Sequence, residues 1–432
     1  MNKLLSIFVT LNLLFINCSK SHSIEWLSAN DWKDIVSLVT EDRSVNIKVT
    51  SDDPIIIDEA LIIDEGQEIV IDGSMSDFML ADGFAAPAFE VYGSLSLSHL
   101  KIRTQGTVDI KSHGIIYVEG GKLLIDDLEA TKFIDSDVSY QDRGFIHLEE
   151  SEAVLTDITL EDIRTYLGSA IYALRSEISI EGAHLEDNEY LCDDDLTGGI
   201  VHIEDTDASI RSSSFINNGS YDVSSNGGAI AISNGGQKDV IIKDCHFEGN
   251  YAAKGAAIYA KDIIDEIEAS TFIDNRAGYG GAIFADHVTL RSCSFKEDRA
   301  NYGSALYLHD GARIEDTEIK DEGYMYGAIY TKATIQIIGG DIEDEIYVAK
   351  DFNPSLEDIS AAIVAERPYG KLTVTLDPEI SKEDFDVICS YEGIFPDVAL
   401  SDREYSLISV TDRSDRHYLR VTKRPIIDTS CR

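Results

Sequence analysis

The chain is poor in positive charge. Its 432 residues hold 36 Lys and Arg against 79 Asp and Glu, which gives a formal net charge of −43 at pH 7. This charge repels phosphate backbones and anionic membrane surfaces, so neither nucleic acid nor an acidic bilayer is an expected partner. The acids alternate with apolar residues, as the outward residues of strands do, and this pattern predicts a solvated acidic surface.

Long apolar runs are also scarce. The run near the N-terminus, Leu4–Ile16, is shorter than the roughly 20 residues that a transmembrane helix needs. It follows Lys3 and precedes the small-residue cleavage site Ser21–Ser23, so residues 1–23 are predicted to be a signal peptide. The mature protein is therefore expected to be secreted or cell-surface associated, without a transmembrane segment. A lipoprotein attached through Cys18 is the less favoured alternative.

Helix-length apolar patterns are nearly absent, and a short repeat takes their place. The repeat is strongest over residues 207–330, where four copies place a ring at the same position: Phe215, Phe247, Phe272 and Phe295. Ile or Leu lies five residues before each ring, and Asn lies three residues after it, with Asp298 replacing Asn in the fourth copy. Weaker copies continue the ring position with Phe133, Leu160, Leu185 and Ile319, at a mean step of about 27 residues. The partners that precede these residues by five positions are Leu128, Leu155, Ile180 and Ile314.

A unit this short cannot bury its own apolar face, so successive copies must stack on one another. Each copy holds two or three alternating strands separated by Gly and Asn corners. Stacked parallel strands lie about 4.8 Å apart and place equivalent residues directly above one another. The predicted fold class is therefore all-β, a right-handed parallel β-helix (solenoid) of roughly a dozen turns over residues 45–350.

The repeated positions have structural interpretations in such a stack. The rings and their aliphatic partners are expected to point inward. The amides Asn218, Asn250 and Asn275 are expected to bond along the axis, at a corner where the backbone is left-handed. Asn218 also begins a glycosylation sequon, and a glycan there would conflict with this packing.

Both ends of the solenoid are predicted to be capped. Ser28–Thr40 has the apolar period of an amphipathic helix, so residues 24–44 are expected to form an N-terminal helical cap over the first strands. Residues 351–432 hold five of the seven prolines and are interpreted as a C-terminal β cap or small module.

The cysteines divide into two groups. Cys245 and Cys293 share a position two turns apart, about 9.6 Å, which is too far for a disulfide, so both are predicted to be buried thiols. Cys389 and Cys431 are hypothesised to close a disulfide in the C-terminal module. Cys192 is left without a partner by this assignment.

Two motifs alternate in the strong copies. F-x-x-N occupies Phe215–Asn218, Phe247–Asn250 and Phe272–Asn275, and G-G-A-I occupies Gly227–Ile230 and Gly280–Ile283. On these motifs the chain resembles the repeat family of the chlamydial polymorphic outer-membrane proteins over about a quarter of its length. The resemblance implies a surface β-helix used in adhesion. It extends only to the β-helix passenger of that family, because no autotransporter barrel is expected after the repeats.

Catalytic motifs are missing. H-E-x-x-H, G-x-S-x-G, P-loop and C-x-x-C patterns do not occur, nor do the Asn-Thr-Asp and Gly-His-Gly segments typical of pectin hydrolases. Lyases of this fold resemble one another in placing carboxylates for Ca²⁺ beside an exposed basic residue, and hydrolases need paired carboxylates. An exposed Arg or Lys facing an acidic cleft across adjacent turns would therefore favour an enzyme, whereas a flat flank would favour a binding protein.

An acidic insertion is the first candidate site. Asp187–Thr197 lengthens its turn and brings together Asp193, Asp194 and Asp195. Clustered carboxylates suit Ca²⁺, which is a hard cation, so this loop is a candidate calcium site. The alternative is a solvated acidic loop, because no EF-hand spacing accompanies it.

An aromatic stripe is the second candidate site. It occupies the position after the inward Ile or Leu of each small-residue corner, which alternation turns outward. The stripe residues are Tyr172, His202, Tyr259, Phe284, Tyr307 and Tyr330. Outward rings at turn spacing would suit sugar rings or the apolar surface of a partner. The alternatives are that aromatics simply favour strands, or that the C-terminal segment covers them.

The sequence thus predicts a secreted or cell-surface, non-enzymatic β-helix protein, adhesin-like or extracellular-matrix-like. It is expected to bind a glycan or an extracellular protein along its flank, with Ca²⁺ as the candidate cofactor. The alternative is a polysaccharide lyase or glycoside hydrolase of the pectin-lyase-like fold, and fold alone does not decide between them.

Overall fold

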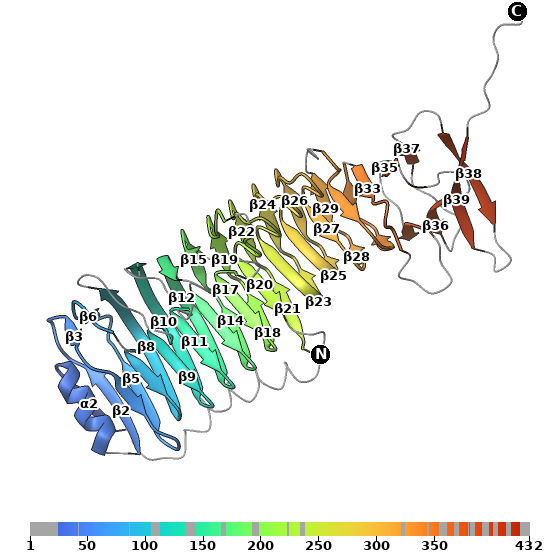
Figure 1. The fold of residues 1–432 in the computed structure, drawn as a ribbon. Helices are drawn as coiled ribbons and strands as arrows, with labels where there is room; N and C mark the ends of the chain where they lie inside the picture. The colour runs from blue at the N-terminus through green and yellow to red at the C-terminus, as the bar shows by residue number, and fades with distance from the viewer. Residues whose placement is uncertain are drawn as a thin grey trace, which may run out of the picture.

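The computed structural model of the protein describes residues 25–41, 43–85, 87–104, 113–134, 144–165, 170–191, 198–222, 224–233, 238–320, 325–343, 345–353, 361–366, 371–378, 380, 385–390, 397–400, 405–411 and 416–423. Within these residues the chain winds into a right-handed parallel β-helix of about eleven turns, which confirms the predicted fold class (Figure 1). None of the helical segments in these ranges is long and apolar enough to cross a bilayer. The predicted signal peptide lies outside the described residues.

Parallel pairing arranges the strands in three faces that run along the axis. The first face contains β1 (Trp26–Ala29), β2 (Ser44–Val49), β5 (Glu68–Asp72), β14 (Glu177–Glu181), β18 (Asp207–Arg211), β21 (Val240–Lys243), β28 (Ala312–Glu315), β31 (Ile335–Ile338), β34 (Ile363–Glu366) and β36 (Asp386–Ser390). The second face contains β3 (Ile55–Ile57), β6 (Asp77–Leu80), β15 (His184–Glu186), β16 (Glu189–Tyr190), β19 (Ser214–Ile216), β22 (His246–Glu248), β24 (Thr271–Ile273), β26 (Ser294–Lys296), β29 (Glu318–Lys320) and β32 (Asp341–Ile342).

The third face follows the second in each turn. It contains β4 (Leu61–Ile63), β7 (Phe89–Val91), β9 (Ile116–Glu119), β11 (Ile146–Glu149), β13 (Ile171–Leu174), β17 (Val201–Glu204), β20 (Ile230–Ser233), β27 (Leu306–Leu308), β30 (Ile329–Thr331), β33 (Glu345–Val348), β35 (Lys371–Leu376) and β37 (Asp397–Leu400). Long strands pass through a corner and belong to two faces: β8 (Ser94–Thr104), β10 (Lys122–Ile134), β12 (Glu152–Thr165), β23 (Ile258–Glu268) and β25 (Ile283–Arg291).

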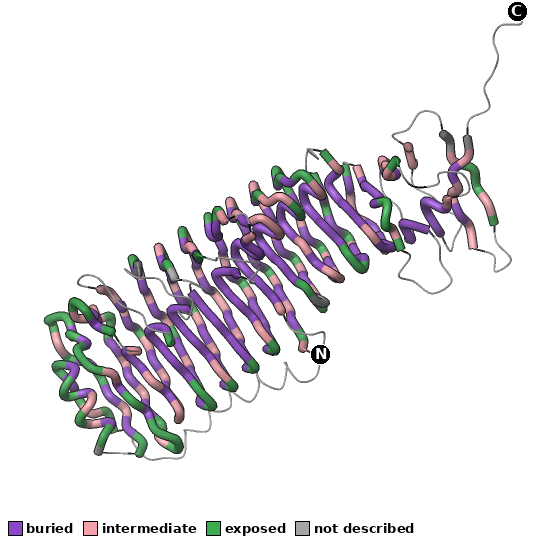
Figure 2. The backbone as a smooth tube through the Cα atoms, in the orientation of Figure 1, coloured by how far each residue is buried: buried purple, intermediate pink, exposed green. Residues whose placement is uncertain are grey.

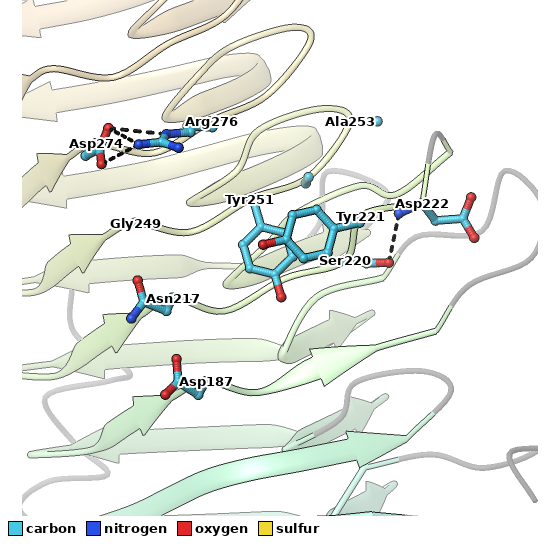
Figure 3. Close-up of a pocket in the computed structure, with 11 residues that line it drawn as sticks. Asp187, Asn217, Ser220, Tyr221, Asp222, Gly249, Tyr251, Ala253, Asp274 and Arg276 are labelled. Carbon is cyan, nitrogen blue, oxygen red and sulfur yellow. Dashed lines mark hydrogen bonds and ion pairs between the residues drawn. The ribbon is translucent and has the colours of Figure 1, made fainter.

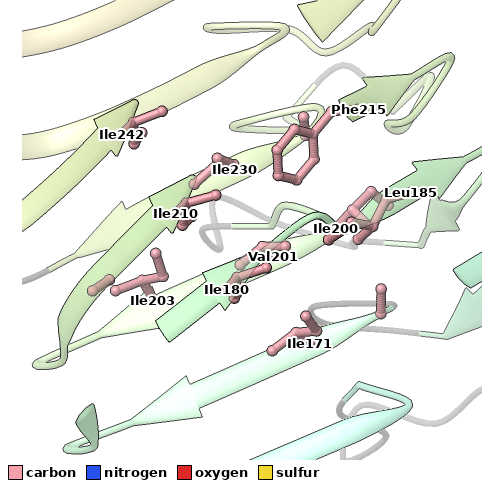
Figure 4. Packing of buried hydrophobic residues seen from close by; sticks show 14 of the residues in the cluster. Ile171, Ile180, Leu185, Ile200, Val201, Ile203, Ile210, Phe215, Ile230 and Ile242 are labelled. Carbon is pink, nitrogen blue, oxygen red and sulfur yellow. The ribbon is translucent and has the colours of Figure 1, made fainter. Parts of the chain in front are cut away.

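The interior is a set of side-chain columns, as predicted. Phe215, Phe247, Phe272 and Phe295 are register partners in successive second-face strands and are fully buried. Their rings stack with centroids 4.5–4.9 Å apart and planes within 6° of parallel. Figure 4 shows how the aliphatic column, including Ile180, Ile210 and Ile242, packs near Leu185 and Phe215. Figure 2 shows the same division along the whole solenoid, with buried residues within the strands and exposed ones gathered at the corners.

The prediction for the outermost weak copy is wrong by three residues. Leu160 pairs with Ala130 rather than Phe133, and Leu128 pairs with Ile158 rather than Leu155. Both strands turn at a left-handed residue, Asp127 and Asp157, with φ of 61° and 49°. Because these corners coincide, they set the register, and the apolar spacing alone could not reveal it.

The amide column forms a continuous hydrogen-bonded ladder. The side-chain oxygens of Asn218, Asn250 and Asn275 each accept from the backbone N–H of the column residue one turn earlier, at 3.0–3.1 Å. Asn188 extends the ladder at one end and Asp298 at the other, where its Oδ1 accepts from the backbone N and Nδ2 of Asn275 at 2.8 Å. All five residues are buried.

The left-handed backbone does not lie at the amides, which corrects that part of the prediction. It lies one residue earlier, for example at Asn217 (φ 54°) and Asp274 (φ 51°). The side chain of Asn218 is fully buried and its Nδ2 donates to Leu185 O at 2.8 Å. Attaching a glycan to this nitrogen would therefore break the ladder.

A short helix covers the N-terminal end of the solenoid. α2 spans Trp32–Glu41, and Asp31 Oδ1 accepts from the backbone N of Asp34 at 2.9 Å, which is an N-cap. Trp32, Ile35 and Val39 are buried, and Trp32 packs edge-on against the ring of Phe89 with centroids 5.7 Å apart. The structure also places strand β1 before this helix, which the sequence pattern did not predict.

At the other end, parallel pairing continues beyond the predicted boundary at residue 350. β35 and β37 extend the third face, and β34 and β36 extend the first. Among the described strands the direction changes at β38 (Tyr405–Thr411) and β39 (His417–Lys423), which form an antiparallel pair, and β39 also runs antiparallel to β36. A strand in the opposite direction ends the stack at this edge.

Two of the cysteine assignments can be compared with the structure. Cys245 and Cys293 are buried free thiols, as predicted. Burial raises the pKa of each thiol to about 11. Cys192 and Cys431 lie outside the described residues, so the Cys389–Cys431 disulfide stays a prediction.

Candidate functional site

The aromatic stripe runs along the third face in strand register, one residue per turn. Tyr259, Phe284, Tyr307 and Tyr330 are successive register partners, and their rings stack with centroids 4.7–5.2 Å apart. Three further residues belong to the stripe: Tyr117, His147 and Tyr347. The sequence analysis missed them, although each lies between two apolar residues at the centre of a third-face strand, and this pattern could have identified them.

The stripe is not an exposed platform, which corrects the prediction. Tyr172, His202, Tyr259, Tyr307 and Tyr330 are between 2% and 9% exposed, and Phe284 is half-buried. The alternation of side chains along the strand correctly predicted that these side chains point away from the interior. It did not foresee that, in the C-terminal half of the stripe, rings in the segments before the third-face strands cover them.

A second column of rings provides this cover. We call Tyr279, Tyr302 and Tyr326 the outer tyrosine column; they are bridge partners in successive turns. Tyr279 packs edge-on against Tyr307 and Tyr302 against Tyr330, with ring centroids 5.7 and 5.5 Å apart. Edge-to-face contacts of this kind are favourable for aromatic rings, so the two columns stabilise each other.

Polar atoms of Tyr172 and His202 are also hydrogen-bonded within the protein. Tyr172 Oη donates to Glu204 Oε2 at 2.8 Å, and His202 Nδ1 lies 3.0 Å from the carbonyl oxygen of Gly198. The two rings stack 4.9 Å apart. These contacts give the N-terminal half of the stripe a structural role.

The outer tyrosine column exposes mainly ring edges. Its rings stack on one another with centroids 4.6–4.8 Å apart and planes within 8° of parallel. Each interior face of such a stack is covered by the next ring, so a ligand can stack only on a terminal ring. Tyr279, which is 39% exposed, is the terminal ring on the N-terminal side.

A second, separate stack contains a ring with one exposed face. Tyr221 is 81% exposed and lies on Tyr251, with ring centroids 4.0 Å apart and an interplanar angle of 19° (Figure 3). The two rings belong to successive turns, just after ladder residues Asn218 and Asn250. A Cβ at Gly219 would collide with the carbonyl oxygen of Tyr251, so glycine is needed where the chain reaches the ring pair.

This ring pair lines a cleft of about 650 Å³ at the corner between the second and third faces. Polar and small residues complete its wall: Asp187, Asn217, Ser220, Asp222, Gly249, Ala252, Ala253, Asp274 and Arg276. An open ring face surrounded by a few converging polar groups is typical of a small-molecule or glycan site. The position after each ladder amide, which Tyr251 and Arg276 occupy, could have identified part of this wall, but the sequence analysis did not consider that position.

Electrostatics differ between the two ends of the cleft. Burial, with the carboxylate of Glu189 next in effect, raises the pKa of the Tyr251 hydroxyl above its usual range, so this ring remains neutral. At the other end Arg276 Nη2 contacts both carboxylate oxygens of Asp274, at 2.9 and 3.1 Å. The side chains of Arg276 and Asp274 are 58% and 35% exposed.

Asp187 and Asp274, two of the three carboxylates that line the cleft, are too far apart to form the catalytic pair of a glycoside hydrolase. Asp187 and Asp274 occupy the same corner position three turns apart, with Asn217 and Gly249 between them. Three turns of parallel strands separate them by about 14 Å. Retaining and inverting hydrolases need carboxyl groups about 5–5.5 Å and about 6.5–9.5 Å apart, respectively.

A hydrogen-bond chain on the second face resembles a hydrolase triad. His184 Nδ1 lies 2.7 Å from Ser214 Oγ, and His184 Nε2 lies 3.0 Å from Glu186 Oε2. An acyl-transfer site would also need donors for the oxyanion. The backbone N–H of Ser214 already donates to Ala183 O at 2.8 Å within the ladder. We therefore assign a structural role to the hydrogen bonds among Ser214, His184 and Glu186.

The candidate calcium site cannot be placed. Asp193, Asp194 and Asp195 lie outside the described residues, so their role stays a prediction. In the part of the chain that the structure describes, no group of three or more His, Cys, Asp or Glu is arranged to hold a metal ion.

The geometry defines a class of protein, a right-handed parallel β-helix with an open aromatic cleft on its flank. A family model described as a right-handed β-helix region matches residues 100–342, which is more than half of the chain. The chain therefore belongs to the right-handed β-helix family. No curated protein matches it.

Proposed function

We propose that this chain is a secreted or cell-surface, non-enzymatic protein that binds a glycan in the cleft at Tyr221 and Tyr251. The observation that carries the proposal is the open outer face of the Tyr221 ring, held by its stack on Tyr251. The apolar face of a sugar can pack on this ring, because a tyrosine offers a large apolar area with a polar tip.

Polar groups beside the ring suit the hydroxyls of a sugar. Asp187, Asn217 and Asp222 line the same cleft and supply acceptors and amide donors. Asn217 belongs to a corner that the adjacent amide ladder holds in place, so part of the site is rigid before binding. Such preorganisation reduces the entropy lost when the ligand binds.

Two sequence features support an extracellular setting for this activity. The predicted signal peptide, residues 1–23, favours export. The resemblance to the repeats of the chlamydial polymorphic outer-membrane proteins favours an adhesin-like or extracellular-matrix-like role, in which the flank meets a glycan-bearing surface.

A glycan array with the purified protein tests the proposal. We expect Tyr221→Ala to lose at least about tenfold in affinity for the glycans that the wild type binds, because one stacking surface and its contacts disappear. Met325→Ala is the matched control, since Met325 is 60% exposed and does not line the cleft. Glycan binding that is the same in wild type and Tyr221→Ala would refute the assignment of the site.

A polysaccharide lyase is the second candidate, favoured by one observation. Arg276 is exposed and faces a cleft that also contains Asp187 and Asp222. Lyases abstract a proton beside a carboxyl group of the sugar and release an unsaturated product. Formation of this ultraviolet-absorbing product, with its loss in Arg276→Gln, would establish the lyase. If the polysaccharide is unchanged after incubation with the protein and Ca²⁺, the lyase is rejected and the non-enzymatic binding function is favoured.

A further inference from the structure

Beyond Tyr251 two arginines follow along the axis of the solenoid. Tyr251, Arg276 and Arg299 are bridge partners in three successive turns, so both guanidinium groups continue the line that begins at the ring pair. Their side chains are 58% and 60% exposed. Two adjacent exposed arginines stand out on a chain whose net charge is −43.

The two arginines share one carboxylate. Asp274 makes close contacts only with Arg276, while Arg299 Nη2 lies 3.8 Å from Asp274 Oδ1. Among the described residues this is the one ion pair of Arg299, and it is longer than a hydrogen bond. The group of three therefore has a net positive charge, and the side chain of Arg299 is 60% exposed. A guanidinium presents its N–H donors as a planar fork that fits a carboxylate or a sulfate.

A tyrosine follows each arginine by three residues along the chain. Tyr279 follows Arg276 by three residues, and Tyr302 follows Arg299 by three residues, each in the same turn. Tyr279 is the terminal ring of the outer tyrosine column and is 39% exposed. From Tyr251 to Arg299 the line extends over two turns, about 10 Å, so it suits an extended ligand that lies along the axis.

We propose that the glycan is anionic, a polysaccharide with carboxylate or sulfate groups that binds along the axis from Tyr221 to Arg299. This inference rests on the proposed glycan-binding function. It adds the chemical class of the glycan and the direction in which the glycan lies on the protein. The charged group binds at Arg276 and Arg299. An uncharged sugar face packs on Tyr221, where Asp187 would repel an anion but accept from hydroxyls.

Calorimetry with three classes of oligosaccharide tests the inference. The probes are a sulfated glycosaminoglycan fragment, an oligogalacturonate and a neutral glucan of similar length, titrated into the full chain at two salt concentrations. We expect at least one of the two anionic probes to bind at least about tenfold more tightly than the glucan, and more weakly at high salt, because surface charge interactions are screened. Tighter binding of the first probe than of the second would indicate recognition of sulfate, because only the first probe carries sulfate groups.

The double substitution Arg276→Gln/Arg299→Gln removes both positive charges and leaves Tyr221 and Tyr251 unchanged. We expect this variant to lose at least about tenfold in affinity for the anionic probe and most of its salt dependence. Arg175→Gln is the matched control, because Arg175 is 45% exposed, pairs with Glu149, and lies after the opposite end of a third-face strand. Thermal melting of all three proteins checks that they are folded.

The outcomes separate the two proposals. If the neutral glucan binds as tightly as the anionic probes, or if the double arginine variant retains full affinity, the anionic assignment is overturned while glycan binding stands. If no probe binds and the glycan array shows no glycan that depends on Tyr221, the proposed function fails and this inference fails with it.

Discussion

The interior column of rings and the aromatic stripe both run along this solenoid, and they are buried in different ways. The interior column of Phe215, Phe247, Phe272 and Phe295 points into the core and is covered by the strands themselves. The aromatic stripe points away from the core, yet most of its residues are also buried. In the C-terminal half of the stripe, a second layer of rings from the preceding segments provides the cover. Pointing outward therefore does not mean being exposed, and the exposed aromatic surface lies one layer further out.

Phe272 and Phe284 make this comparison measurable, because the same deletion can be made in both columns. Phe272 is fully buried between Phe247 and Phe295. Phe284 is half-buried between Tyr259 and Tyr307. The two positions differ in which layer surrounds the ring rather than in strand pairing.

The largest effect is expected for Phe272→Ala. Truncating a buried aromatic side chain leaves a cavity and should lower the free energy of unfolding by about 3–5 kcal/mol. Urea unfolding followed by circular dichroism measures this change. A loss below about 1 kcal/mol would mean that the interior closes around the missing ring, contrary to a close-packed column.

Asn250→Ala is expected to follow closely. Asn250 Oδ1 accepts from the backbone N and Nδ2 of Asn218, at 3.0 and 3.2 Å, and these buried donors would lose their acceptor. Each buried polar group left unsatisfied costs about 1–3 kcal/mol, so we expect a loss of about 3 kcal/mol by urea unfolding. Asn217→Gly is the control for loss of an amide outside the ladder, because glycine adopts the φ of 54° that Asn217 has in the same corner.

Phe284→Ala should destabilise less than Phe272→Ala. Burial of an aromatic side chain contributes about 1.5–3 kcal/mol, and a half-buried ring lies near the lower end, so we expect about 1.5 kcal/mol. The same urea experiment measures it. Equal losses in the two variants would contradict the distinction between the interior column and the stripe.

Near neutral pH the smallest effect is expected for the thiols of Cys245 and Cys293, because their contribution to stability changes only in alkali. Burial raises the pKa of each folded thiol from 9.0 to about 11. The unfolded chain therefore ionises first, so the stabilising contribution is complete below pH 9 and is lost as the pH rises towards 11. Urea midpoints measured across this range should fall with pH. The fall should be shallower in Cys245→Ser/Cys293→Ser, and identical slopes would refute the prediction.

Much of the solenoid could be predicted from spacing alone. The ring position, its aliphatic partner and the amide ladder of the strong copies all lie where the repeat placed them. Prediction failed where strand register depends on the corner residue, as at Asp127 and Asp157. Apolar periodicity shows which residues share a face, but it does not show how far one strand is shifted against the next.

The candidate site was harder to predict. The stripe was found as a column, but its exposure depends on residues in the segments between strands. The ring pair Tyr221 and Tyr251 lies in segments whose length differs from turn to turn, so the two rings do not share a repeat position. Only the folded chain brings them within 4.0 Å of each other.

The sequence by itself determined that this chain stacks into a parallel solenoid, because a repeated unit with too few apolar residues for its own core must bury them against its copies. Only the tertiary structure decided which aromatic rings remain accessible. Accessibility depends on contacts between residues of different turns, such as Tyr279 on Tyr307, and these contacts follow from the paths of the corner segments rather than from the strand pattern.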